Sequence, residues 1–181
     1  MDALEALLTR TAAPRLTDPV PSKEQLELIY KAALRAPDHG MLRSWRYLVV
    51  EGDARHKLGE LFVEAMQPPN EVLVQKLLNA PLRAPMIIIA VATIVEHPKI
   101  PAVEQIGSVA AAIQNMSVAI HALGFASIWR TGPPAFNSAV KLALGLKTTD
   151  EIVGLLYLGT AKVEDRPVPE LNIDDYFQQW P

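Results

Sequence analysis

The sequence predicts one domain of the α+β or α/β class. Segments with helical periodicity alternate with short, apolar, β-rich segments along the whole chain. The helical segments differ in length, and 181 residues are enough to bury one sizeable core. No internal repeat or low-complexity tract interrupts this order, so we expect a single domain over residues 1–181.

The first expected element is a short amphipathic helix over residues 2–10. Leu4, Leu7 and Leu8 fall on one face of this helix. The following segment, 11–21, contains three prolines within eight residues, which cannot continue a helix. We therefore expect this segment to form a loop.

The second expected helix begins at Ser22, which is a favourable N-cap residue. Gln25 completes a capping box three residues later, and Pro37 ends the helix. A strand is then expected over 45–51 because the apolar, β-branched and aromatic residues of WRYLVVE favour a strand. A third helix begins near Asp53.

The middle of the chain contains a helix, a strand and a second, longer helix. The segment 71–79 is expected to be helical and to stop at Pro81. MIIIAVATI, residues 86–94, is a continuous apolar run, which is typical of a strand covered on both faces. Residues 103–123 form the long helix, with Gly124 as its C-cap.

The stretch 105–129 contains no aspartate, glutamate, lysine or arginine and is long enough to span a bilayer. It also contains Gln114, Asn115, Ser117 and His121, whose polar groups are costly in hydrocarbon. We therefore expect a helix buried in a soluble core or in a subunit interface.

The last third of the chain should add two strands and a helix. A strand over 125–130 leads into a turn at 131–134, and a helix around 136–144 follows. The strand 152–159 is then the last regular element. The tail from Lys162 is rich in proline and charge, so it either wraps its own core or reaches onto a partner.

Composition excludes several classes of protein. The formal net charge of −3 provides no positive field for nucleic acid or acidic membranes. The absence of cysteine excludes disulfides, thiolate metal sites and cysteine nucleophiles. The N-terminus lacks the pattern of a signal peptide, and a cytoplasmic location is expected. A hydrophobic fraction of 50% is high enough to suggest a subunit interface.

Several common sites are also missing from the sequence. It contains no G-x-G-x-x-G dinucleotide motif, no phosphate-binding P-loop and no G-x-S-x-G nucleophile motif. The four histidines are not spaced as metal ligands, so no metal site is expected.

Four arginines stand where helices or strands end, or in the loop that follows. Guanidinium groups at such positions can bind phosphate through two hydrogen bonds or place positive charge beside an anionic ring. A cation at a helix C-terminus is also favoured by about 0.3–1 kcal/mol without any ligand. Both interpretations stay open for the individual residues, which are Arg10, Arg15, Arg35 and Arg130.

Five blocks of sequence, in this order and spacing, resemble the FMN-dependent nitroreductase family, in particular its short, single-domain bacterial NAD(P)H nitroreductases. The resemblance covers nearly the whole chain. The blocks are ALLTRTAAPRL, LRAPDHGMLRSWRYLVVE, LRAPMIIIAVAT, IQNMSVAIHALGFASIWRTG and IVGLLYLGT.

This resemblance implies an α+β fold in which helices flank a central mixed β-sheet. It further implies an intertwined homodimer with FMN at the subunit interface, where each subunit contributes to both sites. The long apolar helix would then belong to the dimer core.

The resemblance also implies three groups of cofactor-binding residues. The first binds the FMN phosphate and ribityl chain, the second reaches the flavin from the partner subunit, and the third is another phosphate-side contact. A further stretch, Ala119 to Gly124, matches a region sometimes assigned to the nicotinamide nucleotide. In order, the three groups are Arg10, Thr11 and Ala12; Arg35 and His39; and Trp129, Arg130 and Thr131.

The chain departs from the family pattern at two places. Relatives usually have an arginine and a serine where this chain has Thr11 and Ala12, so one charge and one hydroxyl are missing. The usual N-x-Q-P-W motif is M-L-R-S-W here, which introduces Arg43 and Ser44. Arg43 either supports the N1–O2 edge of the flavin or points to solvent.

The family's activity would be a ping-pong reduction. NADH or NADPH delivers hydride to flavin N5, and a nitroaromatic, a quinone or a similar electron-poor acceptor then takes it up. No side chain is expected to act as nucleophile or general base. Three alternatives stay open: a flavin-binding module without turnover, another FMN reaction such as flavin fragmentation or reductive dehalogenation, and a non-flavin interaction protein.

Overall fold

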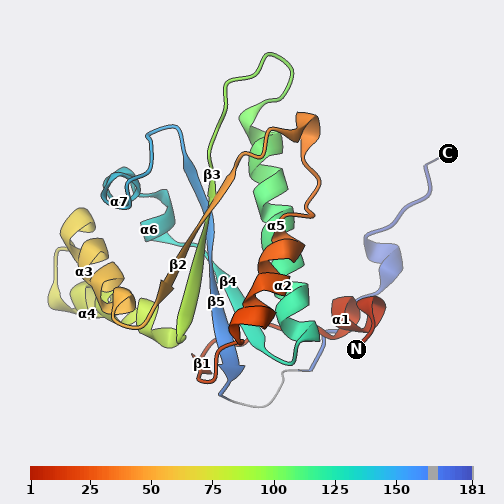
Figure 1. Ribbon diagram of the computed structural model, residues 1–181, viewed down its shortest axis with the longest axis horizontal. Helices are drawn as coiled ribbons and strands as arrows, with labels where there is room; N and C mark the ends of the chain where they lie inside the picture. Colours follow the sequence, from red (N-terminus) through yellow and green to blue (C-terminus); the bar gives the residue numbers. More distant parts are fainter. Residues whose placement is uncertain (163–166, 181) are drawn as a thin grey trace.

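The computed structural model describes residues 1–162 and 167–180. A twisted sheet separates two layers of helices, with α3, α4, α6 and α7 on one face and α2 and α5 on the other (Figure 1). Each face of the sheet has its own cluster of buried apolar side chains. The described helices are α1 (Ala3–Thr9), α2 (Lys23–Ala33), α3 (Ala54–Met66), α4 (Glu71–Asn79), α5 (Ala102–Ala122), α6 (Pro133–Phe136) and α7 (Ser138–Ala143), with short 3₁₀ turns η1 (His39–Met41), η2 (Pro81–Arg83) and η3 (Ile173–Asp175).

Strand β5 is at the centre of the sheet. It pairs with β1, β3 and β4, and β2 pairs with β3 at one edge. All of these pairings are antiparallel, and a single parallel bridge joins Ala12 to Ser127. The α+β class is therefore confirmed. The sheet was expected to mix parallel and antiparallel pairs, but among the described residues the parallel pairing is limited to that bridge. The described strands are β1 (Leu16–Thr17), β2 (Trp45–Glu51), β3 (Met86–Ala92), β4 (Ala126–Arg130) and β5 (Glu151–Ala161).

Strand β3 confirms the prediction of a strand covered on both faces. Every residue from Met86 to Ala92 is buried, because α5 covers one face of the sheet and α3 the other. The strand ends two residues before the expected boundary. Beyond it, the buried amide of Gln105 bonds to both the N–H and the carbonyl of Val95, so this segment pairs with a side chain instead of a strand.

Helix α5 is the long helix predicted from the sequence, and eight of its residues are buried. Leu123 is its C-cap, and Gly124 follows with a φ of 83°. The N–H groups of Gly124 and Phe125 bond back to the carbonyls of His121 and Ile120, which is the Schellman pattern. No helix in the described part of the chain is long and apolar enough to cross a membrane.

Three local predictions were wrong. The expected loop 11–21 contains the two-residue strand β1, which pairs with the end of β5. The expected turn at 131–134 overlaps α6, because prolines at the first helical positions need no N–H partner and already have a helical φ. Asn137 caps a separate helix, α7, by accepting from the N–H of Val140, so the expected helix 136–144 is divided.

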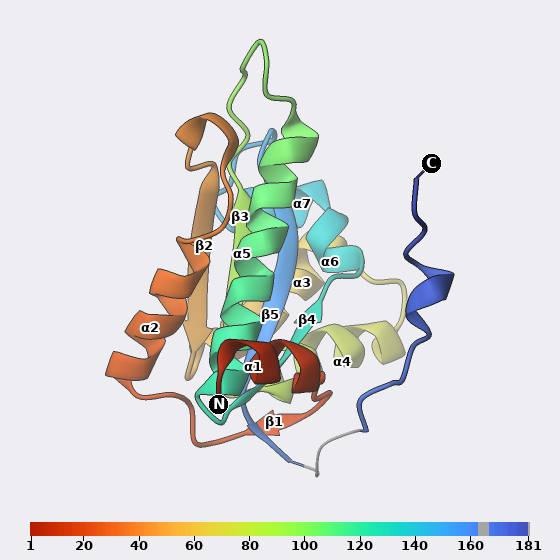
Figure 2. The ribbon, with the colours of Figure 1, turned by 90° about the vertical axis from the view of Figure 1, so that its right-hand side faces the viewer.

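Two apolar surfaces remain exposed on this chain. The helix expected at residues 2–10 is present as α1, but it packs through Ala6, while Leu4, Leu7 and Leu8 are exposed. The described tail, 167–180, runs beside the body of the molecule in an extended path (Figure 2). Its exposed apolar side chains are Val168, Leu171, Ile173, Tyr176, Phe177 and Trp180.

Candidate functional site

The loop 10–14 is held between the C-terminal end of α5 and strand β4. Thr9 Oγ1 donates to the carbonyl of Glu5 at 2.6 Å and lies 2.9 Å from His121 Nε2. Because the hydroxyl has only one proton, Nε2 is the donor in the second bond. The N–H of Ala13 bonds to the carbonyl of Ser127 at 3.2 Å, which fixes the other side of the loop.

Strand β4 also positions the second predicted phosphate-side group. Its last residue, Arg130, donates through Nη2 to the carbonyl of Pro14 at 3.0 Å. Arg10 is half-buried, and its Nη1 donates to the carbonyl of Thr11 at 3.1 Å. The structure thus places the loop 10–14 against β4, although the two segments are far apart in sequence.

A cavity of about 630 Å³ lies between the α3–α4 layer and the segment that follows β4. Most of its wall is apolar, with Phe62 and Met66 from α3 and Leu73 and Leu77 from α4. The three predicted residues Trp129, Arg130 and Thr131 also line the cavity.

The charged groups of the cavity are all positive. Lys76, Arg83 and Arg130 line it, and no aspartate or glutamate is among its described lining residues. Burial lowers the pKa of Arg130, and the nearby positive charge of Arg83 lowers it further, while Tyr157 acts in the opposite direction. The two guanidinium groups therefore repel each other, with Arg130 half-buried and Arg83 exposed.

The guanidinium of Arg130 lies over the ring of Tyr157, 5.7 Å from the ring centroid. Burial raises the pKa of Tyr157, and the charges of Arg130 and Arg83 offset part of that rise. Arg130 Nε is buried and has no hydrogen-bond partner in the described part of the chain. Buried donors without a partner are uncommon in folded proteins.

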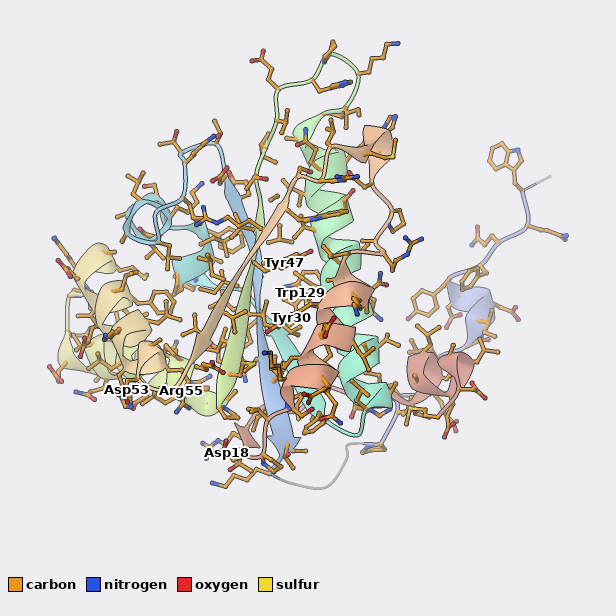
Figure 3. All side chains as sticks on the ribbon, in the orientation of Figure 1. Asp18, Tyr30, Tyr47, Asp53, Arg55 and Trp129 are labelled. Atoms are coloured by element: carbon orange, nitrogen blue, oxygen red, sulfur yellow. The ribbon has the colours of Figure 1, made fainter. Side chains whose placement is uncertain are left out.

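Trp129 is fixed against the central strand. Its Nε1 donates to the carbonyl of Val153 at 3.3 Å, and its ring packs where Gly154 has no side chain. The indole is 40% exposed and lines the cavity. Trp129 is labelled in Figure 3.

The predicted pair Arg35 and His39 lies elsewhere in the same chain. His39 Nδ1 is 2.6 Å from Glu104 Oε2, near the N-terminal end of α5, whereas His121 contacts Thr9 at the other end. At about 1.5 Å of rise per residue, these two ends of α5 are about 25 Å apart. One chain therefore does not bring His39 next to the loop 10–14.

The loop before β2 has an unusual backbone. Gly40, Met41 and Arg43 have φ values of 68°, 52° and 52°. The carboxylate of Asp38 accepts from the N–H of Arg43 at 2.7 Å, which holds this conformation. The side chain of Arg43 is exposed in this chain. Non-glycine residues with positive φ are uncommon and often occur at functional loops.

Two cations of the cavity, Arg83 and Lys76, were missed by the sequence analysis. Arg83 ends the 3₁₀ turn η2, immediately before the segment that enters β3. Arginines at the ends of helices had been singled out at Arg10 and Arg35, and the same rule selects Arg83. Lys76 carries no such signal, because it resembles any solvated lysine of a surface helix.

Comparison with known proteins gives consistent results. The model of the family described as "Nitroreductase family" matches residues 15–160. The chain is 40% identical over 177 residues to "Putative NAD(P)H nitroreductase YdjA" of Escherichia coli K12, covering 97% of this chain and 96% of that protein.

Solved structures show the same fold at lower identity. A nitroreductase-like family protein from Bacillus cereus superposes with a TM-score of 0.82 at 20% identity, covering 99% of this chain and 96% of the other. A nitroreductase from Desulfovibrio desulfuricans, solved in complex with FMN, gives 0.75 at 20% identity, with 100% and 99% coverage.

Proposed function

The chain belongs to the nitroreductase family, and we propose that it is an FMN-dependent oxidoreductase that uses NADH or NADPH to reduce nitroaromatic, quinone or similar electron-poor acceptors. When bound, FMN supplies the hydride chemistry, so the chain needs no nucleophile or general base of its own. Its side chains bind the cofactor and orient the two substrates in turn.

The cavity between the α3–α4 layer and the end of β4 is the observation that carries this proposal. Its apolar walls suit an aromatic ring system, and its three cations suit a phosphate or an electron-rich ring edge. The unpartnered Nε of Arg130 fits an anionic acceptor atom. FMN has both the aromatic and the anionic parts that such a site requires.

We assign the cofactor-binding roles by group. The loop with Arg10, Thr11 and Ala12 would hold the phosphate and ribityl chain. The end of β4, with Trp129, Arg130 and Thr131, would continue the site into the cavity. The proposal treats residues 1–181 as one domain in the cytoplasm, which agrees with the absence of cysteine.

A homodimer completes the proposed site. His39 lies about 25 Å along α5 from the loop 10–14, so we propose that Arg35 and His39 reach the flavin of the other subunit. The exposed leucines of α1 and the aromatic tail provide apolar surface that a second copy of the chain would bury.

An absorbance spectrum of the purified protein, recorded without oxygen, tests the function. We expect a yellow flavin spectrum, either as purified or after FMN is added, that bleaches when NADH or NADPH is supplied. A colourless protein that gains no bound flavin would refute the proposal.

The same absorbance experiment distinguishes the proposed enzyme from the main alternative, a flavin-binding module without turnover. Thr11 and Ala12 remove a charge and a hydroxyl from the phosphate loop, which favours a flavin-binding module without turnover. A bound flavin that stays oxidised with both nicotinamide nucleotides would establish that alternative instead.

A further inference from the structure

We propose that Arg83 and Arg130 form a two-arginine site for the phosphate group of FMN, in the cavity at the end of β4. This inference rests on the proposed function, because FMN is the source of the phosphate. It assigns a binding role to Arg83, which was not among the arginines singled out from the sequence.

The first argument is charge. Two guanidinium groups are close enough for one to lower the pKa of the other, and both lie near the same tyrosine ring. Neither forms an ion pair with a carboxylate in the part of the chain that the structure describes. Two positive charges held close together without a counter-ion repel each other, and a bound anion offsets this repulsion. An anion with two negative charges would neutralise both arginines.

The second argument is geometry. Arg130 uses Nη2 to hold the carbonyl of Pro14, in the loop that also carries Arg10. Its Nε is buried without a partner, and the residue lines the cavity together with Arg83. One guanidinium thus connects the predicted phosphate loop to the cavity that contains the second arginine.

The third argument is the composition of the loop itself. With Thr11 and Ala12, the loop offers only one cationic side chain, Arg10, between residues 10 and 14. A phosphate monoester carries close to two negative charges at neutral pH. Arg83 and Arg130 would supply the positive charge that residues 11–14 lack.

The test compares FMN with riboflavin, which has the same ring but no phosphate. Binding is measured by quenching of flavin fluorescence on titration of the apoprotein. We expect Arg83→Gln to weaken FMN binding at least tenfold and to leave riboflavin binding unchanged. Arg46→Gln is the matched control, because Arg46 is an exposed arginine on β2, outside the cavity, and it should change neither affinity.

A second measurement does not depend on the flavin ring. Inorganic phosphate at millimolar concentration should raise the Tm of the wild-type apoprotein, and Arg83→Gln should abolish most of that rise. Arg83→Lys, which keeps the charge but loses the planar guanidinium, should retain part of it.

Two outcomes would overturn the inference. Equal losses of FMN and riboflavin affinity would place Arg83 against the ring instead of the phosphate. Unchanged FMN binding and phosphate protection in Arg83→Gln would show that Arg83 serves neither. Both outcomes leave the proposed function intact if the wild-type protein binds FMN and bleaches with NADH, so the two failures are distinguishable.

Discussion

Arg130 illustrates how much of this site depends on where a single side chain is placed. Its guanidinium stacks on Tyr157 and holds the loop at Pro14, and its buried Nε has no partner among the described residues. The sequence analysis singled out Arg130 because it ends a strand, but it did not identify these two contacts. They depend on tertiary packing, because their partners are at least 27 residues away in sequence.

Arg10 gives the first prediction at the scale of a residue. Arg10→Ala should weaken FMN binding by about 1.5–3 kcal/mol, the range for losing hydrogen bonds to a charged group. The measurement is a fluorescence titration with FMN, and Arg15→Ala is the control because Arg15 is exposed in the adjoining segment. An Arg10→Ala protein that binds FMN normally would mean that Arg10 acts only as a cation at the end of α1.

Tyr47 provides a prediction for alkaline pH. Burial raises the pKa of Tyr47 to about 12, and its hydroxyl is buried without a partner in the described part of the chain. Since an unfolded tyrosine ionises near pH 10, the folded state keeps a proton that the unfolded state loses. This contribution to stability is fully present below pH 10 and disappears between about pH 10 and 12.

Urea unfolding at pH 9 and pH 11 would measure this effect. Tyr47→Phe should reduce the loss of unfolding free energy between the two pH values, because it removes the titrating group. The pKa of Tyr30 is also raised, so Tyr30 should still cause part of this loss in both the wild type and Tyr47→Phe. Tyr47 and Tyr30 pack in the same apolar cluster between the sheet and helices α2 and α5 (Figure 3). The same pH dependence in wild type and variant would contradict the prediction.

At the scale of elements, the sequence predicts best where local signals are strong. The capping box at Ser22 and Gln25 is present, and the bounds of β2 and α4 agree with the expected 45–51 and 71–79. The two-residue strand β1 could not be predicted, because it exists only through its pairing with β5. The division between α6 and α7 depends on Asn137, whose capping role competes with helix continuation.

Strand β5 carries a prediction about close packing. A Cβ at Gly154 would collide with the indole of Trp129, so Gly154→Ala should displace this ring from the strand and change the cavity wall. We expect a loss of about 1–3 kcal/mol in the free energy of unfolding, as is typical of overpacking, together with altered tryptophan fluorescence.

A double variant separates this collision from other effects. In a Trp129→Ala background, Gly154→Ala should cost much less, because the ring that it meets is gone. If the losses of unfolding free energy from Gly154→Ala and Trp129→Ala simply add, Gly154 is needed for a reason other than its contact with the indole.

At the scale of the whole molecule, the described chain exposes apolar side chains that its own core does not cover. Phe177 is 77% exposed and Trp180 is 92% exposed. Buried aromatic side chains contribute strongly to subunit interfaces. The sequence analysis left open whether the tail wraps its own core or a partner, since that choice depends on contacts between chains. Residues 163–166 and 181 of this tail lie outside the described part.

The tail gives the prediction for assembly. Replacing Phe177 and Trp180 together by alanine should weaken the proposed dimer at least tenfold, as measured by sedimentation at several protein concentrations. Replacing Gln178 and Gln179 by alanine is the matched control and should have little effect, because these neighbours are polar. A dimer unaffected by loss of both aromatic rings would show that the tail does not contribute to the interface.

Helix α5 has one further consequence, for genetics. In the proposed dimer it separates the Arg10 end of one site from the His39 end of the other, so each chain contributes different halves to two sites. A chain damaged at Arg10 and a chain damaged at His39 would each form defective homodimers. Co-expressed in one cell, they would also form heterodimers in which one of the two sites has both halves intact. Such partners should complement each other and bind about one FMN per heterodimer, whereas two chains with the same substitution should not.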